Sequence, residues 1–260
     1  MSRRALLTGT AGGITGAITA AIGVVWGFVL PQFYNEIHIF AVDVSYYTTY
    51  LFNQPTQLWY EHVYPFIFLS PYLPSASLFG ALSFVLSILL IATSILIGVG
   101  FLGTYKIGGG AMGVIGLILS VLGITSGALL IIMGNLTTGY TAAWMMMGES
   151  SYPLFPILIP NFSVIWIGFL VLGFTFFLLG WTGISVRKAT AKPAASAVAG
   201  VLSIINALVF IGAILLISRF SYVDYSALVV FPIVGLIIGF GAMLVAFILW
   251  AWVFYSSRNL

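Results

Sequence analysis

The side chains best suited to metal or redox chemistry gather in one stretch of the chain, between its first two long apolar runs. They are Glu36, His38, Asp43, Glu61 and His62. Imidazole and carboxylate groups together suit zinc or copper, so Glu36, His38, Glu61 and His62 are candidate metal ligands. Glu36 and His38 would share a face if their segment is a strand. No tight HxH or HExxH spacing accompanies them, and hydrogen bonds within a loop, or contact with water, are the commoner role of such residues.

Other catalytic chemistry finds little support in the sequence. The chain has no cysteine, which excludes thiol nucleophiles, thiolate metal sites and iron–sulfur clusters. We find no glycine-rich phosphate loop that opens a helix, and no nucleophile with a matching base. The sequence implies no cofactor, and it favours a non-catalytic protein over an enzyme.

Composition places these residues in a membrane protein. Of 260 residues, 62% are hydrophobic and only 5% are charged, which is too little charge to cover the surface of a soluble domain. The net charge of +3 comes from scattered bases that form no nucleic-acid-binding face. We therefore expect one polytopic membrane domain over residues 1–260, with lipids and other membrane subunits as partners.

The apolar runs predict an all-α bundle of roughly six transmembrane helices. Each run is long enough to cross about 30 Å of hydrocarbon, and each must be helical because lipid cannot satisfy unpaired backbone groups. The predicted spans are Ala5–Leu30, Ser77–Phe101, Gly110–Gly134, Phe162–Ile184, Ala194–Ser218 and Leu228–Phe254.

Charge sets the expected orientation of these spans. If they alternate, nearly all bases fall on one side: Arg3, Arg4, Lys106, Arg187, Lys188, Lys192 and Arg258. All acids fall on the other: Glu36, Asp43, Glu61, Glu149 and Asp224. The positive-inside rule then predicts that both termini are cytoplasmic. We expect the protein in the plasma membrane, and its composition suits a prokaryotic cell envelope. Trp26, Trp144 and Trp166 are expected in the outer aromatic belt, with Trp181, Trp250, Trp252 and Tyr255 in the inner one.

Small residues repeat along the first span in steps of three and four. They are Gly9, Gly13, Gly16, Ala20, Gly23 and Gly27. On a helix this spacing makes one stripe, which lets two backbones approach closely in a bilayer. The stripe predicts helix packing, either inside the chain's own bundle, which we favour, or at a subunit interface.

Polar residues within the predicted spans are few and small. Apart from serine and threonine hydroxyls, which usually bond to carbonyls of their own helix, the spans contain Asn206. We expect Asn206 to form a hydrogen bond between helices.

The long segment 31–76 is expected to form an extracytoplasmic cap. β-Branched and aromatic residues predict a short strand within 37–50, and a membrane-hugging helical segment is expected around 57–70. The residues expected to contact a partner are aromatic: Tyr46, Tyr47, Trp59, Tyr60 and Trp144. Asn135, in an Asn-Leu-Thr sequon, is a possible glycosylation site.

These patterns favour a structural or accessory subunit that docks its partners through aromatic outer loops. Two alternatives remain open. One is a channel or carrier for neutral or lipid-like solutes, which would use the hydroxyls and Asn206. The other is a subunit of a redox complex with a quinone or metal near His38 and His62.

Overall fold

The computed structural model describes residues 2–51, 74–134, 162–220 and 225–260. This part of the chain is helical and contains no strand. Five of its helices are long and apolar enough to cross a membrane, namely Arg3–Leu30, Leu78–Gly134, Val164–Ala189, Pro193–Leu216 and Ile233–Ser257. The prediction of an all-α, multi-pass membrane protein is confirmed at this level.

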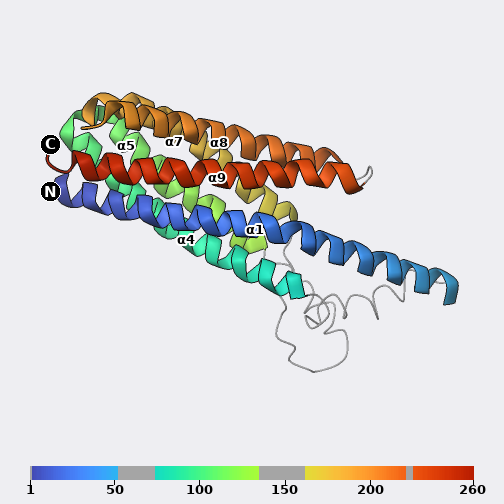
Figure 1. Ribbon diagram of the computed structural model, residues 1–260. Helices are drawn as coiled ribbons and strands as arrows, with labels where there is room; N and C mark the ends of the chain where they lie inside the picture. The colour runs from blue at the N-terminus through green and yellow to red at the C-terminus, as the bar shows by residue number, and fades with distance from the viewer. Residues whose placement is uncertain (1, 52–73, 135–161, 221–224) are drawn as a thin grey trace, which may run out of the picture.

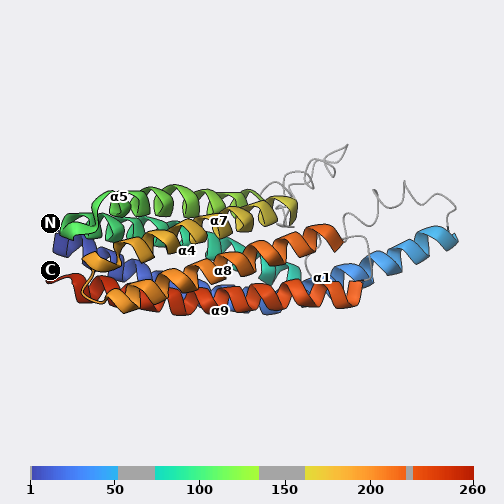
Figure 2. The same ribbon diagram turned by 90° about the horizontal axis from the view of Figure 1, so that it is seen from above.

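The helices pack side by side in a closed ring (Figures 1 and 2). Their bounds are α1 (Ser2–Leu51), α4 (Pro74–Thr104), α5 (Gly110–Ile118), α7 (Phe162–Val186), α8 (Pro193–Phe220) and α9 (Tyr225–Ser257). Going round the ring, α1 packs on α4, α4 on α5, α5 on α7, α7 on α8, α8 on α9, and α9 on α1 again. Both ends of the chain lie at the same end of the bundle (Figure 1).

The longest apolar stretch, Leu78–Gly134, contains 57 residues and turns back on itself. The π-helical segment η3 (Tyr105–Gly109) joins α4 to α5, with non-helical angles at Ile107 and Gly108. Gly108 has φ +108° and Gly110 has φ +57°, a region that glycine enters without a steric penalty. The glycine run therefore breaks the helix between the predicted spans Ser77–Phe101 and Gly110–Gly134, and α5 returns along α4 (Figure 2).

A second π-helical segment interrupts the returning arm, and sequence analysis missed it. This segment, η4 (Leu119–Ile124), follows α5 and precedes the helical residues 125–134. A single π turn inserts an extra residue into the ladder and changes which side chains face the neighbouring helix. Here it lies beside α7, where Gly123 contacts Thr175.

The prediction of a strand within residues 37–50 is wrong. Helix α1 continues unbroken from Ser2 to Leu51. Once a helix exists, each added residue gains one backbone hydrogen bond, whereas an isolated strand has no partner for its backbone. The first part of the expected cap, 31–51, is therefore helical, and the segment 57–70 lies outside the described residues.

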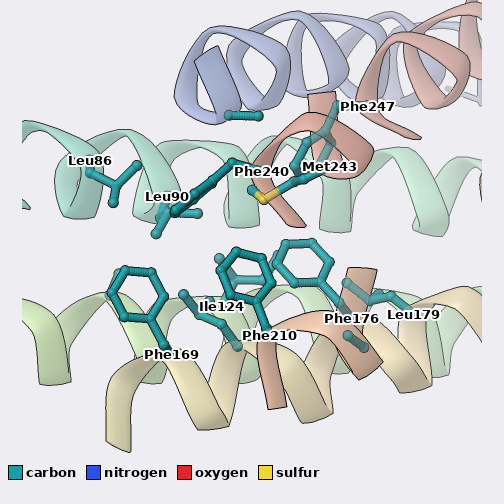
Figure 3. Packing of buried hydrophobic residues seen from close by; sticks show 14 of the residues in the cluster. Leu86, Leu90, Ile124, Phe169, Phe176, Leu179, Phe210, Phe240, Met243 and Phe247 are labelled. Carbon is teal, nitrogen blue, oxygen red and sulfur yellow. The ribbon is translucent and has the colours of Figure 1, made fainter. Parts of the chain in front are cut away.

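Aromatic side chains fill the middle of the ring (Figure 3). In Figure 3, Phe240 and Met243 approach from the α9 side, and Phe169, Phe176 and Phe210 approach from α7 and α8. Phe210 and Phe240 meet edge to face with centroids 5.0 Å apart, a geometry that aromatic pairs favour. Leucine, isoleucine and phenylalanine cover the outside of the bundle, as lipid contact requires.

Two tryptophans expected in the aromatic belts are part of this core instead. Trp26 is fully buried and Trp250 is 3% exposed, whereas Trp181 is 60% exposed and Trp252 is 48% exposed. Depth along a span predicts a belt position, but the side of the helix that carries the residue decides whether it meets lipid or the core.

Candidate functional site

The glycines of α1 form a close seam with both neighbouring helices, which we call the α1 seam. Toward α4, a Cβ atom placed on Gly9 would lie 2.5 Å from the Cα of Gly100. Toward α9, a Cβ atom on Gly13 would lie 2.6 Å from the backbone N of Ala251, and one on Gly16 would lie 2.5 Å from the ring of Phe247. Real Cβ atoms do not approach other atoms so closely, so a side chain at Gly9 or Gly13 would shift a backbone, and one at Gly16 would displace the Phe247 ring.

The rest of the seam continues along the same face. Gly23 contacts Phe240, and a Cβ atom on Gly27 would lie 2.8 Å from the side chain of Ile237. Ala20 is fully buried. Sequence analysis missed Gly12, where a Cβ atom would lie 2.6 Å from the backbone N of Ile97. The Gly12-Gly13 pair was the available signal, because adjacent residues on a helix face two different neighbours.

Near the far end of the seam, Trp26 joins α1 to several helices. Its Nε1–H donates to Ser83 Oγ on α4 at 2.7 Å, so the buried indole is paired. Its ring centroid lies 4.9 Å from that of Phe79 and 5.1 Å from that of Phe169 on α7. Phe240 of α9 lies 6.2 Å away, at a near-perpendicular angle. This aromatic cluster fixes α1, α4, α7 and α9 at one level of the bundle.

A few other polar contacts cross between helices. Ser94 and Thr125 share a hydrogen bond of 2.9 Å, which joins α4 to the arm that returns along it. Ser196 Oγ of α8 donates to the carbonyl of Gly183 on α7 at 2.9 Å. Most other buried hydroxyls bond to carbonyls one turn back in their own helix, as Thr175 does to Val171, so they serve packing and line no polar path.

Asn206 departs from this pattern. It is fully buried in α8, yet neither its Nδ2 nor its Oδ1 has a hydrogen-bond partner. The expected hydrogen bond between helices is therefore absent. The side chain instead lines a small cavity of about 10 Å³. The other lining residues are Ile97, Phe101, Phe176, Leu179, Ser203, Met243, Ala246, Phe247 and Trp250.

Positive charge marks one end of the bundle. The bases Arg3, Arg4, Lys106, Arg187, Lys188, Lys192 and Arg258 lie at the chain termini or in the two turns beside them (Figure 1). Lys192 Nζ lies 5.6 Å from the ring centroid of Trp252, and the Arg258 guanidinium carbon lies 3.5 Å from that of Tyr255. These contacts hold two cations against aromatic rings at the rim of the bundle.

Only some of the predicted ligand and partner residues fall within the described part of the chain. Positions 36, 38, 46 and 47 belong to α1. On a helix, positions 36 and 38 are about 200° apart, so the strand-face argument that paired Glu36 with His38 no longer applies. Glu61, His62, Trp59, Tyr60, Trp144 and Asn135 lie outside the described residues. The metal site, the aromatic interface and the glycosylation site therefore stay predictions.

Comparisons with protein-family models, with curated proteins and with solved structures find no match to this chain.

Proposed function

We propose that this chain is a non-catalytic membrane subunit that crosses the bilayer six times and presents the outer part of α1 to a partner protein. The observation that carries the proposal is the length of α1. The helix contains 50 residues, which corresponds to about 75 Å, whereas the hydrocarbon core of a bilayer is about 30 Å thick. Contacts with α4 and α9 hold its first half, through Gly27 and Leu30.

Residues 31–51 form the remaining part of α1, which we call the α1 rod. In Figure 1 the rod projects past the ends of α4 and α9. A helix anchored this firmly at one end holds a docking surface at a fixed distance from the membrane. Such preorganisation lowers the ordering cost of binding. The sequence of the rod is rich in tyrosine, valine and isoleucine and contains two acids, Glu36 and Asp43, a composition that suits a protein interface.

The count of six crossings and the orientation support each other. The stretch Leu78–Gly134 would be about 85 Å long as one straight helix, so its turn at Gly108 makes it two crossings. With six crossings, both termini and both basic turns share one side, which is cytoplasmic by the positive-inside rule. The α1 rod is then extracytoplasmic.

The interior gives the alternative of a channel or carrier less support. The cavity beside Asn206 is about 10 Å³, space for no more than one water molecule. Around it, the glycine contacts and aromatic rings pack the described helices closely. This close packing favours a structural subunit over a channel or carrier.

The docking role is tested by site-specific photocrosslinking in native membranes. A photoreactive residue at position 46 or 47 of the α1 rod should yield one protein adduct of constant mass. The same residue at Tyr255, at the basic end of α9, is the matched control and should yield lipid adducts. Adducts to lipid alone at all three positions would contradict the proposal.

A helix-breaking variant sharpens this test. Proline in a helix interior removes a hydrogen bond and costs roughly 3 kcal/mol. Phe40→Pro should therefore abolish the adduct from position 47 while leaving the melting temperature of the bundle unchanged. An adduct that survives Phe40→Pro would show that the continuous rod is not what the partner recognises.

Orientation is tested by cysteine labelling. Because the chain has no cysteine of its own, only the introduced cysteine can react. A cysteine at Thr48 should react with an impermeant thiol reagent on intact cells. A cysteine at Ala191, an exposed residue in the turn between α7 and α8, should react only after permeabilisation. The opposite pattern would invert the topology.

A further inference from the structure

We propose that the cavity beside Asn206 is a binding site for one ordered water molecule, which supplies the hydrogen bonds that the protein does not. Asn206 is fully buried, and both polar atoms of its amide lack a partner. An amide buried without hydrogen bonds is strongly unfavourable in an apolar surrounding. Native structures avoid this by pairing such groups with protein or with water.

The polar groups of the site suit a water molecule. Asn206 offers two N–H donors and a carbonyl acceptor. Ser203, one turn earlier on the same face of α8, donates its hydroxyl to the carbonyl of Ala199 at 2.8 Å and retains lone pairs that accept. A water can therefore accept from Asn206 Nδ2 and donate to Ser203 Oγ or to Asn206 Oδ1. Buried waters make two to four such bonds.

The space fits one water and excludes larger ligands. A cavity of about 10 Å³ is at the lower limit that holds a single water molecule. Gly239 on α9 also lies close to the amide, and a Cβ atom there would lie 3.3 Å from Asn206 Oδ1 and 3.4 Å from the Phe210 ring. A glycerol-sized or urea-sized solute would not fit without displacing Phe176, Phe247 or Trp250.

Aromatic rings separate the site from both ends of the bundle. On the side of the basic end, the Phe101 and Trp250 rings meet with centroids 5.1 Å apart. On the other side, Phe210 is stacked on Phe169 with centroids 5.8 Å apart. A water held between these two groups of rings exchanges slowly and belongs to the structure rather than to a conducting file.

The direct test is an experimental structure of the full chain in lipid at a resolution that shows ordered water. We expect one peak of density within hydrogen-bond distance of both the Asn206 amide and Ser203 Oγ. The same peak should be missing in Asn206→Leu, whose side chain is apolar and of similar size. Absence of density beside wild-type Asn206, or a direct bond from its amide to another helix, would overturn the proposal.

Thermal stability gives an independent test. If water satisfies the amide, Asn206→Leu removes paired groups and should leave the melting temperature unchanged or slightly lower. If the amide is dry and unpaired, the same variant relieves its burial cost and should raise the melting temperature by on the order of 3 °C or more, which would overturn the proposal. Ser196→Ala is the matched control on α8. It removes a direct bond to Gly183, so its melting temperature should fall whether or not the cavity is hydrated.

Discussion

The α1 seam and the Asn206 cavity lie in the same bundle, yet they meet its packing demands in opposite ways. At the seam, glycine removes side chains so that backbone meets backbone, as between Gly9 and Gly100. At the cavity, a polar side chain is retained in a space that its neighbours do not fill. Dispersion attraction between the helices becomes stronger as gaps between their atoms are removed. A buried amide instead requires hydrogen-bond partners, and a water molecule can provide them.

The difference predicts that added bulk has different costs at the two places. At Gly9, Gly12 and Gly13, an added side chain would meet backbone atoms, which cannot move without shifting a helix. A cavity position meets side chains and empty space, which can adjust. Thermal unfolding of each variant in the same detergent measures these costs.

The largest effect is expected for leucine in the seam. Gly13→Leu places a side chain against the backbone of Ala251 and should cost about 3 kcal/mol or more. Gly16→Leu should cost less, because the Phe247 ring it meets can rotate. The control is Ile18→Leu, since Ile18 is 53% exposed and lies away from the seam. A Gly13→Leu variant as stable as wild type would mean that the seam is not closely packed.

A smaller loss is expected when the polar contact of the seam is removed. Ser83→Ala leaves the buried Trp26 N–H without its acceptor and should cost about 1–3 kcal/mol. Trp26→Phe with Ser83→Ala removes both partners, so the double variant should lose less than the sum of the two single losses. Additive losses in this cycle would show that the bond contributes nothing.

Substitution by alanine should raise stability at glycines whose added Cβ atom would have no close neighbour. A Cβ atom on Gly212 or Gly241 has no neighbour within 4 Å. Alanine there reduces the freedom of the unfolded chain and should stabilise by about 0.5–1 kcal/mol. Destabilisation by Gly241→Ala would indicate that this face of α9 contacts another molecule in the membrane.

The smallest effect is expected beside the cavity. Gly239→Ala puts a methyl group 3.3 Å from Asn206 Oδ1, which is tight contact with a side chain that can shift. The gain in helix propensity, about 0.5–1 kcal/mol, should offset this crowding and leave stability near that of wild type. A loss as large as that of Gly13→Leu would mean that the cavity is as rigid as the seam, and the contrast between them would fail.

Sequence analysis predicted the spacing of the seam but not its division between two helices. Steps of three and four residues align Gly13, Gly16 and Gly23 on any helix, because the period of the α-helix is fixed. Which neighbour each glycine meets depends on how α4 and α9 pack around α1. The spacing therefore carries no sign that Gly12 meets α4 while Gly13 meets α9.

In the outer part of α1, the local residue pattern did not predict the observed secondary structure. β-Branched and aromatic residues predicted a strand within 37–50, and the first predicted span ended at Leu30. The structure continues the helix to Leu51. Propensity is a weak preference that context overrides, and here the context is a long helix already formed before Pro31.

The sequence by itself determined the properties that depend on composition and on position along the chain. Hydrophobic runs gave the apolar helices, the Gly108–Gly110 run gave the turn between α4 and α5, and the placement of bases gathered positive charge at one end. These features follow from transfer free energies and backbone sterics, which act residue by residue. Only the tertiary structure decided which side of each helix faces inward. That choice buried Trp26 against Phe79 and left the Asn206 amide without a protein partner, because both results depend on side chains brought together from distant parts of the chain.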